Sequence, residues 1–308
     1  MKWIVKALTQ KCLSALPRGE YVNYQLQKYV TRSIPVSDQV FRHKVEIAIE
    51  HIRRFAQYSK SSKTTESRIL EFGAGWELIG PLVILALGFR NQITIDIVRH
   101  TRLELIWDTI RRMRAMKGDL ERMAGSGFAL NLDFFEGTSD PSLQTLEGLG
   151  LSYRAPLDIR NTGFEEDSFD LIINTSTLEH IPFQDVVRLS HECRRILCPG
   201  GILSCAIDLS DHYAHFDPSI SIYNFMKFSD STWRIFNSRI QFQNRLRVGD
   251  YIRIFRDAGF GILELKKYAG SERDISMLGH IRLNHKYRGR DFAEDIAPRR
   301  LDAVLEKM

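Results

Sequence analysis

A turn between a predicted strand and a predicted helix has the residue types of a nucleotide-binding site. The segment ILEFGAGW places Glu71, Gly73 and Gly75 after a short β-rich run and before an apolar helix. Glycines let the backbone approach a ligand closely and adopt positive φ, and the start of the helix presents unpaired N–H groups. A dinucleotide fingerprint would need a third glycine where Leu78 stands, and a P-loop would need a GK[ST] sequence that does not follow.

Two more acidic residues stand at the ends of predicted strands. Asp96 ends the second strand, 21 residues after Gly75, where its carboxylate can accept hydrogen bonds from both ribose hydroxyls of an adenosine. Asp158 ends the third candidate strand, where it can accept from an adenine amino group. A single acid at a strand end is often only solvated, but three acids at three successive strand ends favour a nucleoside site.

Two polar clusters follow the next two predicted strands, and ligands of such sheets bind outside these strand ends. Glu179 and His180 follow one strand, and the run DLSDHYAHFD (208–217) follows the other. A histidine, alone or paired with a carboxylate, can take a proton from an alcohol near neutral pH. We therefore predict His180, Asp211 and His212 as catalytic residues, with Asp211 and His212 as a base dyad. The alternative for His180 is that it only shapes the pocket.

The same run offers two other interpretations. Asp208 and Asp211 could hold a divalent ion that binds a sugar diol, but no ligand geometry can be checked from the sequence, and we predict no bound metal. Aromatic residues follow closely and could form a wall for a sugar or another ring, although a hydrophobic lid is the simpler interpretation. These aromatic residues are Tyr213, Phe216, Tyr223, Phe225 and Trp233.

Strands alternate with helices from Arg68 onward, which is typical of a mostly parallel sheet covered on both faces. The expected strands are 68–72, 92–97, 152–157, 169–174, 201–208, 260–268 and 300–308. The expected helices of this part are 76–87, 101–123, 182–197 and 247–258. Residues 124–150 and 270–300 are expected to be insertions, the first with little regular structure.

Residues 1–63 are predicted to form an N-terminal helical cap, and residues 64–308 the main domain. The first 63 residues carry twelve Lys and Arg against four acidic residues, a net charge of +8, whereas the remainder is −3. One helix is expected near the start, with Ile4, Leu8 and Cys12 on its apolar stripe, and a second over 37–58. We favour a packed cap over the alternative, a weak contact of residues 1–16 with an anionic membrane surface.

Composition places the chain among ordinary globular proteins. It has 308 residues, 44% hydrophobic and 26% charged, with a net charge of +5, so fibrous and wholly disordered classes are excluded. The longest apolar run, 78–89, is too short to span a bilayer, and no secretory signal stands at the N-terminus. The four cysteines have no CxxC spacing, so we expect a reducing, cytoplasmic location and no zinc site of cysteine type.

The successive segments ILEFGAG, ITIDI, LDIRNTGFEEDSFDLIINTSTLEHI and RRILCPGGIL resemble the motifs of class I S-adenosylmethionine-dependent methyltransferases, specifically the group with an LEHI signature after the fourth strand. The resemblance covers residues 68–208 well and 240–308 loosely. It implies a Rossmann-like α/β fold with a seven-stranded, mostly parallel sheet of order 3-2-1-4-5-7-6, whose last strand is antiparallel. The predicted cap and insertions are additions to this fold.

The resemblance also implies a role for each residue of the cofactor site. Glu71, Gly73, Ala74 and Gly75 would wrap the methionine end of S-adenosyl-L-methionine, and Asp96 would hold the ribose. Asp158 and Ile159 would frame the adenine. Asn174 and Thr175 would lie along the other side of the cofactor.

The function predicted from these features is methyl transfer to a hydroxyl of a small molecule or of a glycan, as in surface-polysaccharide assembly. Methylation of a lipid-linked or quinone-like acceptor is the alternative suggested by the basic N-terminus. A non-catalytic cofactor-binding protein is a further alternative, which the complete glycine turn and the His/Asp run disfavour. A nucleic-acid substrate is not expected, because no basic RNA-binding module or NPPY-type motif is present.

Overall fold

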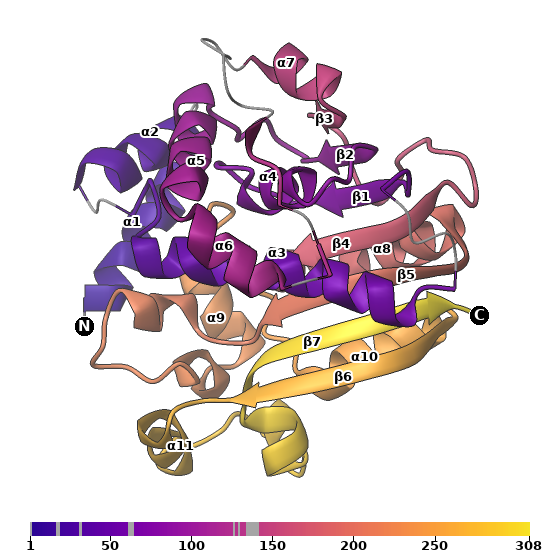
Figure 1. Ribbon diagram of the computed structural model, residues 1–308. Coiled ribbons are helices and arrows are strands. Elements are labelled where there is room, and N and C mark those ends of the chain that lie inside the picture. The colour runs from indigo at the N-terminus through magenta and orange to yellow at the C-terminus, as the bar shows by residue number, and fades with distance from the viewer. Residues whose placement is uncertain are drawn as a thin grey trace.

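The computed structural model describes residues 2–16, 19–30, 33–60, 65–125, 127–128, 130–133 and 142–308. Within them the protein has one seven-stranded sheet, shown in Figure 1. Its strands are β1 (Ile69–Phe72), β2 (Gln92–Ile95), β3 (Leu151–Arg154), β4 (Phe169–Thr175), β5 (Leu197–Asp208), β6 (Phe260–Ala269) and β7 (Pro298–Lys307).

The strand order is β3-β2-β1-β4-β5-β7-β6, which confirms the predicted fold class. Strands β1 to β5 pair in parallel, and β7 runs antiparallel to both of its neighbours. Phe72 of β1 lies opposite Ile95 of β2 and Asn174 of β4. The carboxyl ends of these three strands are therefore level, and the residues that follow them meet at one edge of the sheet.

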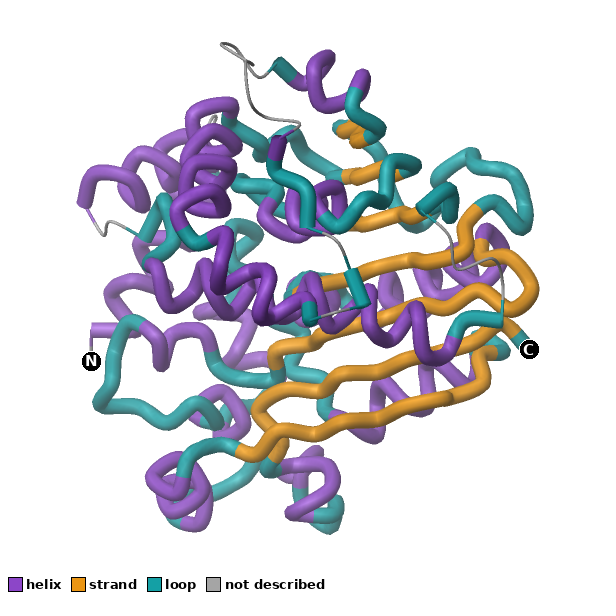
Figure 2. The backbone as a smooth tube through the Cα atoms, viewed as in Figure 1, coloured by secondary structure: helices purple, strands orange, loops and turns teal. Residues whose placement is uncertain are grey.

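Helices cover both faces of the sheet (Figure 2). The helices in chain order are α1 (Lys2–Ser14), α2 (Gly19–Gln25), α3 (Asp38–Tyr58), α4 (Ile79–Ala86), α5 (Leu103–Ala115), α6 (Lys117–Ala124), α7 (Leu143–Gly148), α8 (Phe183–Ile196), α9 (Asp230–Phe236), α10 (Val248–Asp257) and α11 (Glu272–Gly279). Shorter helical segments are η1 (Leu26–Val30), η3 (Leu178–His180), η4 (His212–His215), η5 (Asn224–Lys227), η6 (His285–Tyr287) and η7 (Phe292–Ile296).

The alternation of side chains along the central strands separates two apolar layers. On one face, Leu171 and Ile173 of β4 pack in a cluster with α3, α4, α5 and α6. On the other face, Ile172 packs in a cluster with α8 and α10. Strands that are apolar on both faces are typical of parallel sheets with helices on both sides, which explains why the runs ILEF and FDLIIN contain so few polar residues.

Three predicted segments differ from the structure. The helix expected over 101–123 is divided at Met116, whose φ of −110° lies outside the helical range and ends α5 before α6 begins. The expected insertion 124–150 contains α7, and its residues 126, 129 and 134–141 lie outside the described residues. The insertion 270–300 is mostly helical and ends early, because β7 begins at Pro298.

The first helix packs with a different face from the one expected. The buried residues of α1 are Trp3, Ala7 and Gln10, whereas Leu8 and Cys12 of the predicted stripe are exposed. The Trp3 ring contacts Tyr213, Phe228 and Phe236, with ring centroids 4.9 to 5.8 Å apart. The predicted stripe was wrong because the aromatic residues of 213–236, which are distant in sequence, decide which side of the helix is buried.

The second N-terminal helix, α3, is part of the main core. Its Val45, Ile52 and Phe55 lie in the same apolar cluster as α4 and the sheet. The predicted cap boundary at residue 63 lies outside the described residues. No helix in the described parts of the chain is long and apolar enough to cross a bilayer.

Replacement of Trp3 by alanine tests the packing of α1. Trp3 is 4% exposed, so Trp3→Ala removes a large buried aromatic side chain and is expected to lower the free energy of unfolding by about 3 kcal/mol. Urea unfolding measures the change. The matched control is Val5→Ala on the same helix, because Val5 is 66% exposed and its loss is expected to change stability by less than about 0.5 kcal/mol. Equal effects of the two substitutions would contradict the packing of α1.

Candidate functional site

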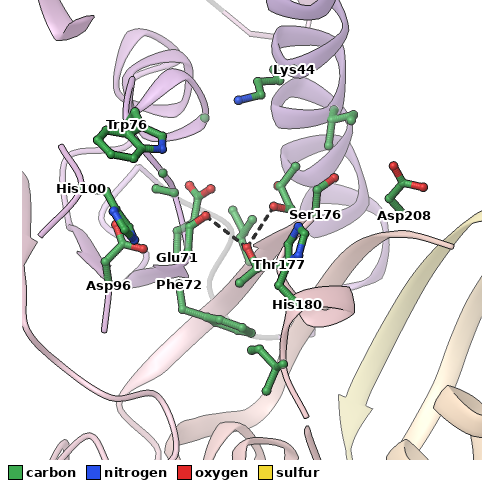
Figure 3. Close-up of a pocket in the computed structure, with 18 of the residues that line it drawn as sticks. Lys44, Glu71, Phe72, Trp76, Asp96, His100, Ser176, Thr177, His180 and Asp208 are labelled. Carbon is green, nitrogen blue, oxygen red and sulfur yellow. Dashed lines mark hydrogen bonds between the residues drawn. The ribbon is translucent and has the colours of Figure 1, made fainter. Parts of the chain in front are cut away.

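A cleft of about 1390 Å³ opens at the carboxyl ends of β1, β2, β4 and β5. Figure 3 shows Glu71 and Asp96 on one side of it and His180 and Asp208 on the other. The predicted site residues that line it are Glu71, Gly73, Ala74, Gly75, Asp96, Asp158, Ile159, Thr175 and His180. The structure therefore brings most of the predicted cofactor residues and one predicted catalytic residue to one cavity.

The glycine turn has the backbone that the sequence predicts. Gly73 and Gly75 have φ of +78° and +75°, which favour glycine over any residue with a side chain. A β-carbon at Gly73 would lie 2.3 Å from Oγ1 of Thr177, and this hydroxyl donates a hydrogen bond to the Gly73 carbonyl oxygen at 3.1 Å. A β-carbon at Gly75 would have no neighbour within 4 Å. The turn is thus held on one side by Thr177 and open beside Gly75.

Glu71 is a buried carboxyl group with an incomplete set of partners. Its side chain lies close to Gly80 of α4, where a β-carbon would be 3.1 Å from each carboxyl oxygen. Its Oε2 atom has no hydrogen-bond partner among the described residues. Burial, with the nearby charge of Asp96, raises the pKa of Glu71 to about 8. A polar ligand in the cleft would supply the partner that the protein lacks.

Asp96 follows β2 and points into the cleft near the glycine turn (Figure 3). It is 6% exposed and accepts a hydrogen bond from the Tyr153 hydroxyl at 3.0 Å. Burial raises the pKa of Asp96 to about 7, although the Tyr153 hydrogen bond opposes the shift. Tyr153, on the neighbouring strand β3, was not identified from the sequence, because parallel pairing of β2 and β3 is what brings it beside Asp96.

Asp158 and Ile159 line the cleft, but the Asp158 carboxylate already has a partner. Arg160 Nε donates to both Asp158 oxygens, at 3.0 and 2.9 Å. These hydrogen bonds hold the pKa of Asp158 below its usual range. The guanidinium also lies 2.8 Å from Asp185. The pairing competes with any acceptor role of Asp158 toward a ligand.

Of the two predicted residues at the end of β4, Thr175 lines the cleft and Asn174 does not. Asn174 is fully buried and its Nδ2 donates to the Phe72 carbonyl oxygen at 3.3 Å. The structure therefore gives Asn174 the role of joining β4 to the end of β1, immediately before the glycine turn. Its contact with the cofactor stays a prediction, and its buried Oδ1 atom has no hydrogen-bond partner among the described residues.

His51 is a cleft residue that the sequence analysis missed. It lies on α3, with its Nδ1 2.7 Å from the Ser204 hydroxyl and its Nε2 3.1 Å from the Thr175 hydroxyl. Burial, assisted by the charge of Arg54, lowers the pKa of His51 to about 3, so the ring is neutral. The available signal was a histidine among the apolar residues of that helix, between Ala48 and Phe55.

Histidines and acids gather on the opposite side of the cleft. His180 Nδ1 lies 2.6 Å from the Phe242 carbonyl oxygen, so this nitrogen carries the proton and Nε2 keeps the lone pair. Burial and the charge of His212 lower the pKa of His180 to about 4. The rings of His180 and His212 meet edge to face, with centroids 4.9 Å apart.

The carboxylate partner of His212 is Asp208. Its Oδ2 lies 3.4 Å from His212 Nε2, and its Oδ1 accepts hydrogen bonds from the backbone and hydroxyl of Ser210. Although burial opposes it, the contact with His212 keeps the pKa of Asp208 below its usual range. Burial lowers the pKa of His212, but the contact with the Asp208 carboxylate outweighs burial, so the pKa of His212 is raised above its usual value.

The predicted Asp211/His212 dyad was wrong. Asp211 is fully buried, its Oδ1 accepts from the Tyr213 backbone at 2.9 Å, and its Oδ2 accepts from Asn224 Nδ2 at 3.0 Å. It therefore caps η4 and does not line the cleft. Four of the five aromatic residues considered for a ring-binding wall are instead buried in a cluster of their own: Tyr213, Tyr223, Phe225 and Trp233.

Glu179 precedes His180 on η3, and neither of its carboxyl oxygens has a hydrogen-bond partner among the described residues. It is 5% exposed, and the backbone N–H groups of Glu179 itself and of Asp208 only partly favour its charged form. Burial, with the charge of Asp208, raises the pKa of Glu179 to about 8. The site thus contains a second buried acid whose partners are incomplete.

Two comparisons with known proteins find methyltransferases. Residues 131–205 match the profile of a family described as "Methyltransferase domain". Among solved structures, the chain is similar to an S-adenosylmethionine-dependent methyltransferase from Mesorhizobium loti, with 14% identity, a TM-score of 0.40, and coverage of 83% of this chain and 96% of that one. A methyltransferase from Methanosarcina mazei has 15% identity, a TM-score of 0.44, and coverage of 80% and 94%. No curated protein sequence matches the chain.

Replacement of Glu71 by glutamine tests the cost of its burial. A carboxyl group whose pKa is raised by folding keeps its proton longer in the folded state, so stability falls as pH rises from about 4.5 through about 8. Glu71→Gln removes this titration and is expected to stabilise the cofactor-free protein at pH 8, by up to about 1.4 kcal/mol for each unit of the shift, and to change little at pH 5. Thermal unfolding at both pH values measures it.

The control for this experiment is Glu121→Gln on α6, because Glu121 is exposed and its substitution is expected to leave the pH dependence unchanged. A wild type and a Glu71→Gln variant with parallel stability profiles would contradict the burial argument.

Proposed function

Since the chain carries a class I S-adenosylmethionine-dependent methyltransferase domain, we propose that it transfers the methyl group of this cofactor to a hydroxyl of a small molecule or a glycan. One observation carries the proposal. The glycine turn with Asp96 and the polar residues His180 and Asp208 open into the same cleft, from opposite sides. A methyl donor and a hydroxyl acceptor need this arrangement, because methyl transfer is an in-line displacement that depends on positioning.

The cofactor would lie along the carboxyl ends of β1 and β2. Positive φ at Gly73 and Gly75 lets the backbone of the turn approach the methionine end, with Ala74 between them. The carboxyl group of Asp96 would accept from the two ribose hydroxyls, and Ile159 would contact the adenine. Glu71 would gain from the methionine amino group the partner that its Oε2 atom lacks. Asp158 would contribute only if Arg160 moves away.

The acceptor would lie between the cofactor and the histidines. During transfer the sulfur–carbon bond breaks as the carbon–oxygen bond forms, and the hydroxyl proton must leave. The Nε2 lone pair of His180 and the carboxylate of Asp208 are the groups that can bind this hydroxyl and favour its deprotonation, because both residues line the cleft. His212 would support them by its contact with Asp208.

A lipid-linked acceptor is the second candidate, and one observation favours it. Val5 and Leu8 of α1, and Leu16 after its end, are exposed, at 66%, 44% and 56%, and Lys2 of α1 is exposed as well. Apolar and basic side chains on one surface are typical of contact with an anionic membrane. This surface lies on the other side of α1 from Trp3 and Ala7, so it remains available in the folded protein.

The ribose assignment is tested by cofactor binding. Asp96→Ala removes a buried acceptor of two hydroxyl groups, so its affinity for S-adenosylmethionine is expected to fall by on the order of 1–3 kcal/mol. Isothermal calorimetry measures the loss, and circular dichroism checks that the variant is folded. The control is Asp257→Asn, an exposed acid on α10, which is expected to bind as the wild type does. Equal affinity of wild type and Asp96→Ala would exclude the ribose assignment.

The acceptor class is tested by turnover. We expect transfer of label from methyl-labelled S-adenosylmethionine to hydroxyl compounds within a panel of small alcohols, phenols, oligosaccharides and lipid-linked sugars. His180→Ala is expected to lower turnover by about 10²–10⁴ and to leave cofactor affinity nearly unchanged. His191→Ala, an exposed histidine on α8, serves as the control. Turnover confined to lipid-linked compounds supports the second candidate, and transfer only to nitrogen or carbon acceptors contradicts the proposal.

A further inference from the structure

Glu179, His180 and His212 form a cluster with the residue types and the spacing of a metal-binding site. We propose that Glu179, His180 and His212 bind one divalent transition-metal ion, with Asp208 beside them. This inference deepens the proposed function, on which its catalytic meaning rests, but metal binding is measured without turnover.

Three ligand atoms converge there from two separate parts of the chain. Glu179 and His180 lie on η3 after β4, and His212 lies on η4 after β5. One ligand atom of each residue lies within 4.8 Å of the others. Because β4 and β5 are neighbouring parallel strands, the sheet itself fixes the distance between these two short helices.

The carboxyl group of Glu179 supplies the second, independent observation. It is 5% exposed, and neither oxygen has a hydrogen-bond partner of ordinary geometry among the described residues. A buried carboxyl group without a partner is costly, and buried charges in proteins are generally paired or coordinate metals. A cation held between the carboxyl group and the two imidazoles would remove this cost.

The orientation of the two imidazoles agrees with metal binding. His180 donates its Nδ1 proton to the Phe242 carbonyl oxygen at 2.6 Å, which fixes the ring and leaves Nε2 as the ligand atom. Metal-binding histidines usually have such a backbone or carboxylate partner on their other nitrogen. His212 Nε2 is buried without a regular hydrogen bond and lies 3.4 Å from Asp208 Oδ2. Asp208 is therefore placed either to orient His212 or to act as a fourth ligand.

Two imidazoles and one carboxylate indicate the class of ion. This ligand set suits Zn²⁺, Mn²⁺, Co²⁺ or Fe²⁺ better than Mg²⁺ or Ca²⁺, which prefer oxygen ligands. His180 and Asp208 also line the cleft, so the ion would be open to the acceptor on that side. A hydroxyl that coordinates a divalent ion loses its proton more easily, which is the effect that the proposed reaction needs.

The experiment uses the full chain without an affinity tag, stripped with a chelator and then titrated with Co²⁺ and, separately, with Zn²⁺ and Mn²⁺. We expect one ion per chain by calorimetry and, for Co²⁺, visible absorption bands that report nitrogen and oxygen ligands. Glu179→Gln and His212→Ala are expected to weaken binding by at least about 10-fold, since even the loss of groups that only orient a ligand has this effect. His191→Ala is the control for adventitious binding to exposed histidines.

Affinity for S-adenosylmethionine shows whether each variant is folded and is expected to stay within about twofold of the wild type, because none of these residues lies at the glycine turn. Absence of binding for all three ions, or equal binding by wild type, Glu179→Gln and His212→Ala, would overturn the inference. Hydroxyl methylation that persists in a chelator-stripped protein without a metal site would retain the proposed function and refute the ion. Metal binding without any hydroxyl turnover would support the metal site and refute the proposed function.

Discussion

Burial of charged side chains at one edge of a parallel sheet is the constraint on which this structure depends. The carboxyl ends of β1, β2, β4 and β5 each deliver an acid to the cleft or to its wall. Low exposure raises the pKa of Glu71, Asp96 and Glu179, because few groups of the protein compensate for the lost water. Such groups lower the stability of the folded chain and, for the same reason, favour polar ligands that complete their hydrogen bonds.

The fold tolerates this cost because its centre is apolar on both faces. The clusters around α3 and α4 on one side, and around α8 and α10 on the other, enclose the central strands completely. Buried apolar area is the main favourable contribution to folding, so a rigid centre can carry unfavourable groups at its edge. The side chains at this edge are held in defined positions, because Glu71 and Asn174 belong to strands whose register is fixed by this packing.

The elements that the sequence predicts well are those with a local or periodic signal. The strand runs, the glycine turn and Asp96 at a strand end follow from spacing alone, and the resemblance supplied the strand order that the structure confirms. The residues that were misplaced depend on contacts between distant segments. Asp211 is of the residue type that could pair with a histidine base, but both of its carboxylate oxygens already accept hydrogen bonds, one from the Tyr213 backbone and one from Asn224. His51 and Tyr153 reach the cleft only because of helix packing and strand pairing, which no local pattern records.

The N-terminal residues contact both sides of the cleft, although they belong neither to the glycine turn nor to the polar run 208–217. On the side of the histidines, the backbone N–H of Trp3 donates to Asp217 at 3.1 Å, and the Trp3 ring packs on Tyr213, the residue after His212. On the cofactor side, Tyr24 stacks on Trp76, which follows the glycine turn, with ring centroids 4.8 Å apart. The segment before α3 thus braces the helix of His212 at one end and the glycine turn at the other. Because these contacts are made by side chains that are mostly buried, the relative position of the two sides is a property of the whole chain and not of the sheet alone.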